Sequence, residues 1–266
     1  CQLGDDVVAT GLLGGHMGAF LADRMDDDGI PHDFVAIAGE SRVCIAVIHD
    51  GAQTEFLESG PTVSADELAQ FDAKFAELVR EASCVTISGS LPAGIESGYY
   101  VKLVEAAHAA GVPVLVDTSG ASLDAILAAP VKPTLIKPNL SEICGLLGAN
   151  YTPDDVAELE GLLASDERFA GISWVVVTMG AAGAVAFHDG RGYRVVTPAI
   201  KAVNATGSGD STVAGFAHAI AAGMDDEDVL RWGNTCGKLN AMDPQTGHLV
   251  MSEWDSVFNS IEVKRL

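Results

Sequence analysis

From residue 84 into the C-terminal third, short apolar runs alternate with segments of helical periodicity. The runs are rich in Val, Ile and Leu and lack a polar residue at every second position, as is typical of strands in a parallel sheet that helices cover on both faces. Repeated units of this kind predict an α/β fold with a doubly wound, mostly parallel sheet sandwiched by helices. We expect strands at 84–90, 113–119, 134–139 and 173–180, and helices near 96–110, 121–129, 140–147 and 210–223.

The segment before residue 61 has another pattern. Its short β-branched runs predict a small antiparallel sheet, with turn residues such as Asp50-Gly51 between the strands. At Ser64 the pattern changes, because Ser64 and Glu67 have the spacing of a capping box that opens a helix. We therefore predict a β lid at 32–60, with strands at 33–39, 42–51 and 54–60, and an α/β domain formed by 1–31 and 61–266.

The balance of charges restricts the partners of the chain. It has 15 Lys and Arg against 37 Asp and Glu, a net charge of −22, and such a surface repels nucleic acids and anionic membranes. The five cysteines are scattered and lack a C-x-x-C pair, which indicates reduced thiols rather than disulfides or a zinc site. No apolar run reaches the length of a membrane span and no secretory signal is recognisable, so we expect a cytoplasmic protein.

Polar or glycine-rich residues follow four of the predicted strands. These segments are S-G-S-L-P from Ser88, D-T-S-G from Asp117, K-P-N-L-S-E from Lys137 and T-M-G-A-A-G from Thr178. In doubly wound folds, ligands bind outside the carboxyl ends of the strands. We therefore expect the four segments to surround one crevice.

The sequence Gly207-Ser208-Gly209-Asp210 leads directly into an apolar helical run. Unpaired backbone amides at a helix start attract an anion, and glycine lets that anion approach the backbone closely. Asp210 would then stand beside a phosphoryl group and accept a proton from an attacking hydroxyl group. The alternative is a glycine-rich turn in which Asp210 only caps the helix, and the spacing alone does not decide between the two.

Other candidate residues also have structural alternatives. Lys137 could bind a phosphate, while Asn139 and Glu142 offer the oxygen ligands that magnesium prefers, unless they belong to an ordinary capped helix. Thr178, Gly180 and Gly183 could line a nucleotide or form a plain β-turn. Arg42 could clamp a substrate phosphate or make a surface ion pair with a local carboxylate.

Together, these motifs resemble those of the ribokinase/PfkB family of sugar kinases. The resemblance spans essentially all 266 residues, from the β-rich lid to the G-x-G-D motif. Within the family, the segments at 40–61, 87–94, 135–142 and 240–248 are most similar to kinases of tagatose 6-phosphate, followed by 1-phosphofructokinases. Family members begin with a strand bearing a sugar-binding Asp and with a G-G-K-G-x-N segment, both of which would precede Cys1.

The resemblance implies a role for each candidate residue. It implies that Asp210 is the catalytic base and that Gly207, Ser208 and Gly209 form an anion hole. It implies that Asn139 and Glu142 support magnesium, and that the nucleotide is bordered by Lys137, Asn139, Thr178, Gly180 and Gly183. It also implies that Arg42 grips the sugar phosphate and that Ser88, Gly89 and Ser90 lie near the sugar.

The implied reaction is the conversion of D-tagatose 6-phosphate to D-tagatose 1,6-bisphosphate with ATP and Mg²⁺. One alternative is a kinase that converts fructose 1-phosphate to fructose 1,6-bisphosphate. The other is a non-catalytic sensor of nucleotides or sugar phosphates. By resemblance, the lid strands would also pair two chains into a homodimer.

Overall fold

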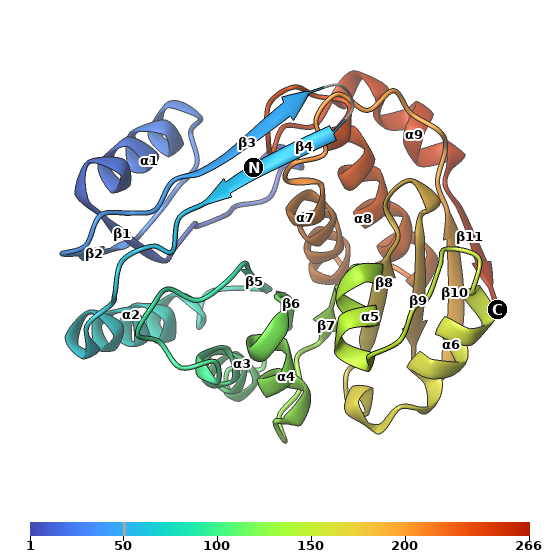
Figure 1. Ribbon diagram of the computed structural model, residues 1–266, viewed down its shortest axis with the longest axis horizontal. Helices are drawn as coiled ribbons and strands as arrows, with labels where there is room; N and C mark the ends of the chain where they lie inside the picture. Colours follow the sequence, from blue (N-terminus) through green and yellow to red (C-terminus); the bar gives the residue numbers. More distant parts are fainter. Residues whose placement is uncertain (50–51) are drawn as a thin grey trace. The chain divides into compact units, whose positions relative to one another are not determined.

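The computed structural model describes residues 1–49 and 52–266, so the turn predicted at Asp50-Gly51 lies outside the described residues. The chain forms two compact units (Figure 1). The first comprises Cys1–Glu81 and Leu91–Tyr99, and the second comprises Ala82–Ser90 and Tyr100–Leu266. The assignment of 32–60 as a lid stays a prediction.

The second unit is built on a seven-stranded sheet with the order β11-β10-β9-β8-β7-β6-β5. Its strands are β5 (Val85–Ser88), β6 (Val114–Asp117), β7 (Leu135–Ile136), β8 (Trp174–Thr178), β9 (Ala184–His188), β10 (Arg191–Val196) and β11 (Glu262–Arg265). Strands β5 to β8 are parallel, whereas β8 to β11 pair antiparallel. The α/β fold class is thus confirmed, with a sheet that is mixed.

The antiparallel pairing of β9 with β10 follows from a short connection. A parallel strand needs a crossover of about a dozen residues or more, and the chain turns from β9 into β10 within two residues. Those residues, Asp189 and Gly190, have φ values of 47° and 77°, the left-handed conformation that a tight hairpin turn requires. Such a turn allows only antiparallel pairing.

Helices cover both faces of this sheet. They are α3 (Tyr99–Ala109), α4 (Gly120–Ala128), α5 (Leu140–Leu147), α6 (Val156–Ser165), α7 (Ser208–Ala221), α8 (Asp226–Ala241) and α9 (Trp254–Ser260). The four predicted helices are present, and the acidic run at 225–228, which also indicates a helix start, opens α8. Helices α6 and α9 were not predicted. Tyr193 of β10 packs in the core with Phe216 of α7 and Leu230 of α8, while a Cβ on its neighbour Gly192 would meet Glu160 of α6. Because neighbouring residues of a strand point to opposite faces, α6 lies opposite α7 and α8.

The first unit contains two separate pairs of strands. The parallel pair is β1 (Leu12–Gly14) with β2 (Val35–Ile37), joined through α1 (Gly15–Asp27). The antiparallel pair is β3 (Cys44–His49) with β4 (Ala52–Leu57). The prediction that 33–39 belongs to one antiparallel sheet with these last strands is wrong, because β2 pairs with β1, a strand that the pattern did not reveal.

Helix α2 (Ala65–Leu78) begins as predicted. The amide of Glu67 donates to Oγ of Ser64 at 3.3 Å, and the amide of Ser64 donates to Oε2 of Glu67 at 2.7 Å, which confirms the capping box. Phe71 and Phe75 bury the apolar face of the helix. The local signals of residue type and spacing are sufficient to place this helix start.

Two expectations concern the chain as a whole. Within residues 1–49 and 52–266, no helix has both the length and the apolar character of a membrane span. All five cysteines are free thiols. The expectation of reduced cysteines therefore agrees with the structure.

Candidate functional site

Hydrogen bonds join the carboxyl ends of the parallel strands into one polar edge of the second unit. The amide of Gly89, after β5, donates to the carbonyl of Asp117 at 2.9 Å, and the hydroxyl of Thr118 donates to the carbonyl of Gly89 at 2.9 Å. After the next strands, the amide of Thr178 donates to the carbonyl of Pro138 at 3.0 Å. The four polar segments expected around a crevice therefore lie along one edge of the sheet.

Lys137 is buried at this edge and forms an ion pair with Asp117. Its side chain is 5% exposed, and its Nζ lies 2.9 Å from Oδ2 of Asp117. Burying an ammonium group is costly unless a counter-charge and hydrogen bonds accompany it. Asp117 therefore both compensates the charge of Lys137 and fixes the position of its ammonium group.

The start of α7 lies directly against this ion pair. A Cβ atom on Gly209 would lie 3.4 Å from Nζ of Lys137 and 3.6 Å from Oδ2 of Asp117. Gly207, the N-cap residue, has φ 81°, a left-handed conformation that favours glycine. Within the described part of the chain, the amides of Gly207, Gly209 and Asp210 have no acceptor. These amides, the helix dipole and Lys137 make residues 207–210, which we call the cradle, suited to an anion.

Ser208 differs from the expectation for the cradle. Its amide donates to the carbonyl of Ala205 at 3.1 Å, so the prediction that this amide is unpaired is wrong. Helix α7 begins at Ser208 rather than at Asp210. The turn at 205–208 precedes it, and the amide of Ser208 closes this turn with its hydrogen bond to Ala205. The hydroxyl of Ser208 instead accepts a hydrogen bond from Nδ2 of Asn240 at 3.0 Å.

Asp210 is a carboxylate with a raised pKa at the edge of the cradle. Although the residue is exposed to solvent, the surrounding protein removes part of the hydration of its carboxylate, and this desolvation raises the pKa of Asp210 above its ordinary value. The negative charge of Asp117 raises this pKa further, and Lys137 lowers it. A carboxyl group with a raised pKa beside an anion site is suited to take a proton from a reacting hydroxyl group.

Asn139 and Glu142 form the capping box of α5. The amide of Asn139 donates to Oε2 of Glu142 at 2.7 Å, and the amide of Glu142 donates to Oδ1 of Asn139 at 2.9 Å. The capped-helix alternative is therefore present in the structure. Burial raises the pKa of Glu142, with a further increase from Asp117, so this carboxylate belongs to the same group of charges as the ion pair.

The charges at this edge fit a divalent cation bound together with phosphate. Three interacting carboxylates, Asp117, Glu142 and Asp210, share the single ammonium group of Lys137 among the described residues of the edge. No cluster of three or more His, Cys, Asp or Glu with metal-binding geometry occurs in residues 1–49 and 52–266. Magnesium commonly binds one or two carboxylates and completes its shell with water and phosphate oxygens, so the carboxylates present are compatible with it.

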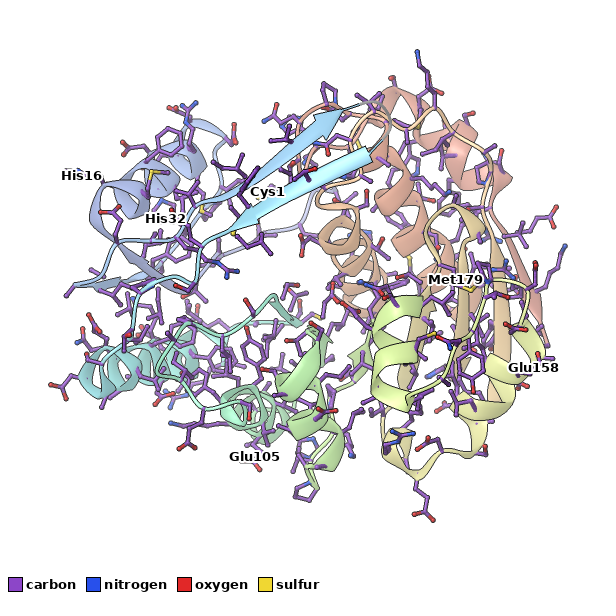
Figure 2. All side chains as sticks on the ribbon, viewed as in Figure 1. Cys1, His16, His32, Glu105, Glu158 and Met179 are labelled. Atoms are coloured by element: carbon purple, nitrogen blue, oxygen red, sulfur yellow. The ribbon has the colours of Figure 1, made fainter. Side chains whose placement is uncertain are left out.

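The segment from Thr178 to Gly183 is a tight turn between β8 and β9. The amide of Met179, labelled in Figure 2, donates to the carbonyl of Gly183 at 2.8 Å. Gly183 has φ 87°, and a Cβ atom there would lie 2.1 Å from the carbonyl oxygen of Val195. Packing against β10 therefore requires this glycine, while a β-bridge between Asn139 and Thr178 places the other end of the turn beside the start of α5.

The remaining predicted residues divide between the units. Ser88 is the last residue of β5, and Gly89 and Ser90 follow it at the polar edge. Arg42 belongs to the first unit, where its Nη1 donates to the carbonyl of Glu58 at 3.5 Å. The predicted contact of Arg42 with a sugar phosphate stays a prediction.

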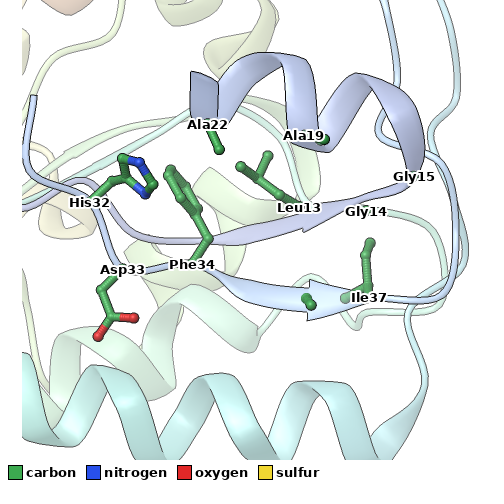
Figure 3. A pocket seen from close by; sticks show the side chains of 11 residues that line it. Leu13, Gly14, Gly15, Ala19, Ala22, His32, Asp33, Phe34 and Ile37 are labelled. Carbon is green, nitrogen blue, oxygen red and sulfur yellow. The ribbon is translucent and has the colours of Figure 1, made fainter. Parts of the chain in front are cut away.

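A pocket of about 470 Å³ in the first unit contains none of the predicted site residues. Figure 3 shows Ala19 and Ala22 of α1 on one side and His32 and Phe34 on the other. Most of its lining residues are apolar or small. The candidate site therefore lies at the polar edge of the second unit rather than in this pocket.

Two residues of the edge had no individual role predicted from the sequence, although Asp117 opens the D-T-S-G segment and Asn240 begins the segment at 240–248. Asp117 pairs with Lys137, and its position as the last residue of an apolar strand was the signal that could have identified it. Asn240 is fully buried and donates to Ser208 of the cradle. It lies 32 residues from its partner, and no local pattern indicates such a contact.

Comparisons with known proteins agree with this geometry. The model of the pfkB family carbohydrate kinases matches residues 1–253. A Thermotoga maritima protein described as "possible 1-phosphofructokinase" superposes with a TM-score of 0.87 and 25% identity, covering 100% of this chain and 84% of that one. Escherichia coli phosphofructokinase-2 in complex with fructose 6-phosphate superposes with a TM-score of 0.81 and 27% identity, covering 97% of this chain and 82% of that one. The tetrameric inhibited form of that enzyme superposes with a TM-score of 0.82 and 26% identity, again covering 97% of this chain and 82% of that one.

Proposed function

The chain belongs to the pfkB family of carbohydrate kinases, and from that premise we propose that it phosphorylates tagatose 6-phosphate at the 1-hydroxyl group with ATP and Mg²⁺. The observation that carries this proposal is the buried Lys137–Asp117 pair packed against Gly209, one residue from Asp210. This arrangement puts an anion cradle, a fixed cation and a carboxylate with a raised pKa at one edge. These are the parts that phosphoryl transfer requires.

Each group in the site has a separate task. ATP supplies the phosphoryl group, and Mg²⁺ offsets the charge of its phosphates. Asp210 accepts the proton of the attacking 1-hydroxyl group, and the amides of Gly207 and Gly209 donate to the transferring phosphoryl group. Lys137 neutralises part of the developing charge from a position that Asp117 fixes. Glu142 and Asn139 would hold the metal, and the backbone amide of Asn139 aligns the carboxylate of Glu142.

Further residues complete the proposal. Thr178, Gly180 and Gly183 border the nucleotide, supported by the bridge between Thr178 and Asn139. Ser88, Gly89 and Ser90 contact the sugar, supported by their place at the strand-end edge. Arg42 binds the phosphate group of the sugar phosphate. A cytoplasmic location belongs to the same proposal, because ATP and sugar phosphates are cytoplasmic metabolites.

A panel of substrates separates this function from its alternatives. The full-length protein would be assayed for ADP release with tagatose 6-phosphate, fructose 6-phosphate and fructose 1-phosphate. The highest kcat/KM is expected with tagatose 6-phosphate. A preference for fructose 1-phosphate would support the second candidate, which the similarity to the Thermotoga maritima protein favours. Nucleotide binding without product from any sugar phosphate would support a sensor.

Replacing Asp210 by Asn tests the assigned base. We expect Asp210→Asn to lower kcat by about 10²- to 10⁴-fold, the usual contribution of a general base, while ATP binding changes little. Steady-state assays and calorimetric titration with ATP would measure the two quantities. The exposed Asp154→Asn variant is the control, and near-normal turnover in Asp210→Asn would exclude the role of Asp210 as the base.

We also propose that the β3–β4 hairpin pairs two chains. Ile45 and Phe56 are cross-strand partners and are 54% and 61% exposed, and Leu57 is 66% exposed. Apolar side chains on a two-stranded hairpin are a common basis for association. The tetrameric form of the Escherichia coli enzyme shows that a similar protein assembles.

Light scattering during gel filtration tests this pairing. The wild-type chain is expected to have the mass of a dimer, and Phe56→Ser is expected to shift it toward the monomer. Val203→Ser is the control, because Val203 is 46% exposed but lies in the second unit. A monomeric wild-type protein would contradict the proposed dimer.

A further inference from the structure

Asn240 connects the cradle to the loop that follows α8. Its Nδ2 donates to the carbonyl of Thr206 at 2.9 Å and to Oγ of Ser208 at 3.0 Å. Its Oδ1 accepts a hydrogen bond from the amide of Gly247 at 2.7 Å. One side chain in the last turn of α8 therefore binds both the segment that enters the cradle and the loop at 242–248.

The environment of Asn240 makes these contacts important for the conformation of the cradle. The residue has no exposed surface, so water cannot replace a hydrogen bond that is lost. Both donor hydrogens of the amide group are used, and its oxygen accepts a third bond. A fully satisfied buried network of this kind keeps its members in one arrangement.

A second set of contacts packs the same two segments together. The amides of Val203 and Asn204 donate to the carbonyl of Ala241 at 2.7 and 3.2 Å, and Nδ2 of Asn204 donates to the carbonyl of Pro244 at 3.1 Å. A Cβ atom on Gly207 would lie 2.7 Å from Cγ2 of Thr246. The left-handed N-cap of α7 therefore rests on the loop that Asn240 fixes.

From these contacts, we propose that Asn240 is a positioning residue for phosphoryl transfer, which keeps the cradle amides aimed at the transferring group. The inference rests on the proposed function. Donors that are fixed before the reaction stabilise the transition state more than the bound substrate. Loss of the Asn240 contacts should therefore lower kcat more than it raises KM.

Two substitutions separate the contacts of Asn240. Asn240→Leu has a similar volume and removes all three hydrogen bonds. Asn240→Asp preserves the acceptor for Gly247 but replaces the donors to Thr206 and Ser208. Asn234→Leu is the matched control. Asn234 is also buried in α8, and among the described residues its Nδ2 donates only within the helix, to the carbonyl of Leu230 at 2.8 Å.

Kinetics of the full-length protein with tagatose 6-phosphate give the first test. We expect kcat to fall about 10- to 100-fold in Asn240→Leu and Asn240→Asp. This decrease is smaller than the roughly 10³-fold decrease that the complete removal of one anion-hole donor can cause. KM for the sugar phosphate should stay within about threefold, as expected when a contact acts mainly in the transition state. Asn234→Leu should unfold at a lower temperature but keep its kcat. Equal kcat values in Asn240→Leu and Asn234→Leu, or a normal kcat in Asn240→Asp, would overturn the proposal.

Hydrogen exchange gives a second test that does not depend on turnover. The amides of Thr206, Ser208 and Ser211 donate to Oδ1 of Asn204 and to the carbonyls of Ala205 and Gly207. These three amides should exchange faster in both Asn240 variants than in wild type, and should not change in Asn234→Leu. If the wild-type protein phosphorylates no sugar phosphate, the proposed function fails, and the exchange rates then decide whether Asn240 fixes the cradle. Unchanged exchange in both Asn240 variants would overturn the inference whatever the activity.

Discussion

Among single residues, Lys137 influences the chemistry of the site most, because its charge acts on three carboxyl groups. Its ammonium group pairs with Asp117 at 2.9 Å, and the same lysine lowers the pKa of Asp210 and of Glu142. Burial and the charge of Asp117 act in the opposite direction and prevail, so both carboxyl groups have raised pKa values. Asp117 therefore tunes the proposed base as well as positioning the lysine.

This balance predicts how pH affects catalysis. A base must be ionised, so kcat/KM should decrease as the pH falls through the raised pKa of Asp210. In Asp117→Asn the neighbouring negative charge is absent, so the pKa of Asp210 decreases and the acid limb moves to lower pH. Profiles of kcat/KM against pH would measure the shift, with Asp154→Asn as the control. An acid limb that moves to higher pH would contradict the role of Asp117.

At the scale of elements, two helices begin with the same motif but in different surroundings. Helices α2 and α5 both begin with a capping box, formed by Ser64 with Glu67 and by Asn139 with Glu142. Hydrogen bonds from the backbone amides of Ser64 and Ala38 lower the pKa of Glu67. Burial raises the pKa of Glu142 more than its capping hydrogen bond lowers it. The sequence motif is thus shared, and the tertiary environment decides its electrostatics.

Replacing the Glu of each capping box by Gln, which preserves a side-chain acceptor, should therefore change the melting temperature in opposite directions for α2 and α5. A raised pKa in the folded state means that stability present at low pH is lost as the pH rises through that pKa. Glu142→Gln should then raise the melting temperature at neutral pH, whereas Glu67→Gln, which replaces a carboxylate of lowered pKa, should reduce it. Thermal unfolding at neutral and acidic pH would measure both effects, which should shrink in acid.

Glu142→Gln also tests the proposed metal role in the same element. Removing the carboxylate charge should raise the Mg²⁺ concentration that gives half-maximal activity, because a neutral amide is a weaker ligand for this ion. Glu67→Gln lies in the first unit and should leave that concentration unchanged. An unaltered Mg²⁺ requirement in Glu142→Gln would contradict metal binding by Glu142.

For the whole molecule, the net charge of −22 opposes the approach of its proposed substrates. ATP and a sugar phosphate are both anions, and surface charges act on them over roughly a Debye length, about 8 Å at physiological ionic strength. Lys137 is buried and paired, so salt screens its local attraction less than the long-range repulsion. The surface and the site therefore differ in their dependence on salt.

Moderate salt should accordingly increase kcat/KM for ATP relative to very low ionic strength. Sodium chloride and tetramethylammonium chloride should act alike if screening is the cause, and titrating both would separate screening from a specific effect of one cation. A steady decrease of kcat/KM with either salt would show that attraction, rather than repulsion, dominates the encounter.

The sequence by itself determined the features that depend on neighbouring residues. The periodicity of apolar residues predicted the parallel strands and four helices, and residue type and spacing placed the start of α2. The motifs after the strands identified the edge at which Lys137, Asn139 and Glu142 lie. These signals are readable because a strand, a helix start or a tight turn is set mainly by a few consecutive residues.

Only the tertiary structure decided which distant residues meet. It paired β2 with β1, extended the sheet with antiparallel strands and used the amide of Ser208 within a turn. It also set Asp117 against Lys137 and brought Asn240 to Thr206, 34 residues away. Such contacts arise from the packing of whole elements around a shared core, and no local pattern of residues specifies their geometry.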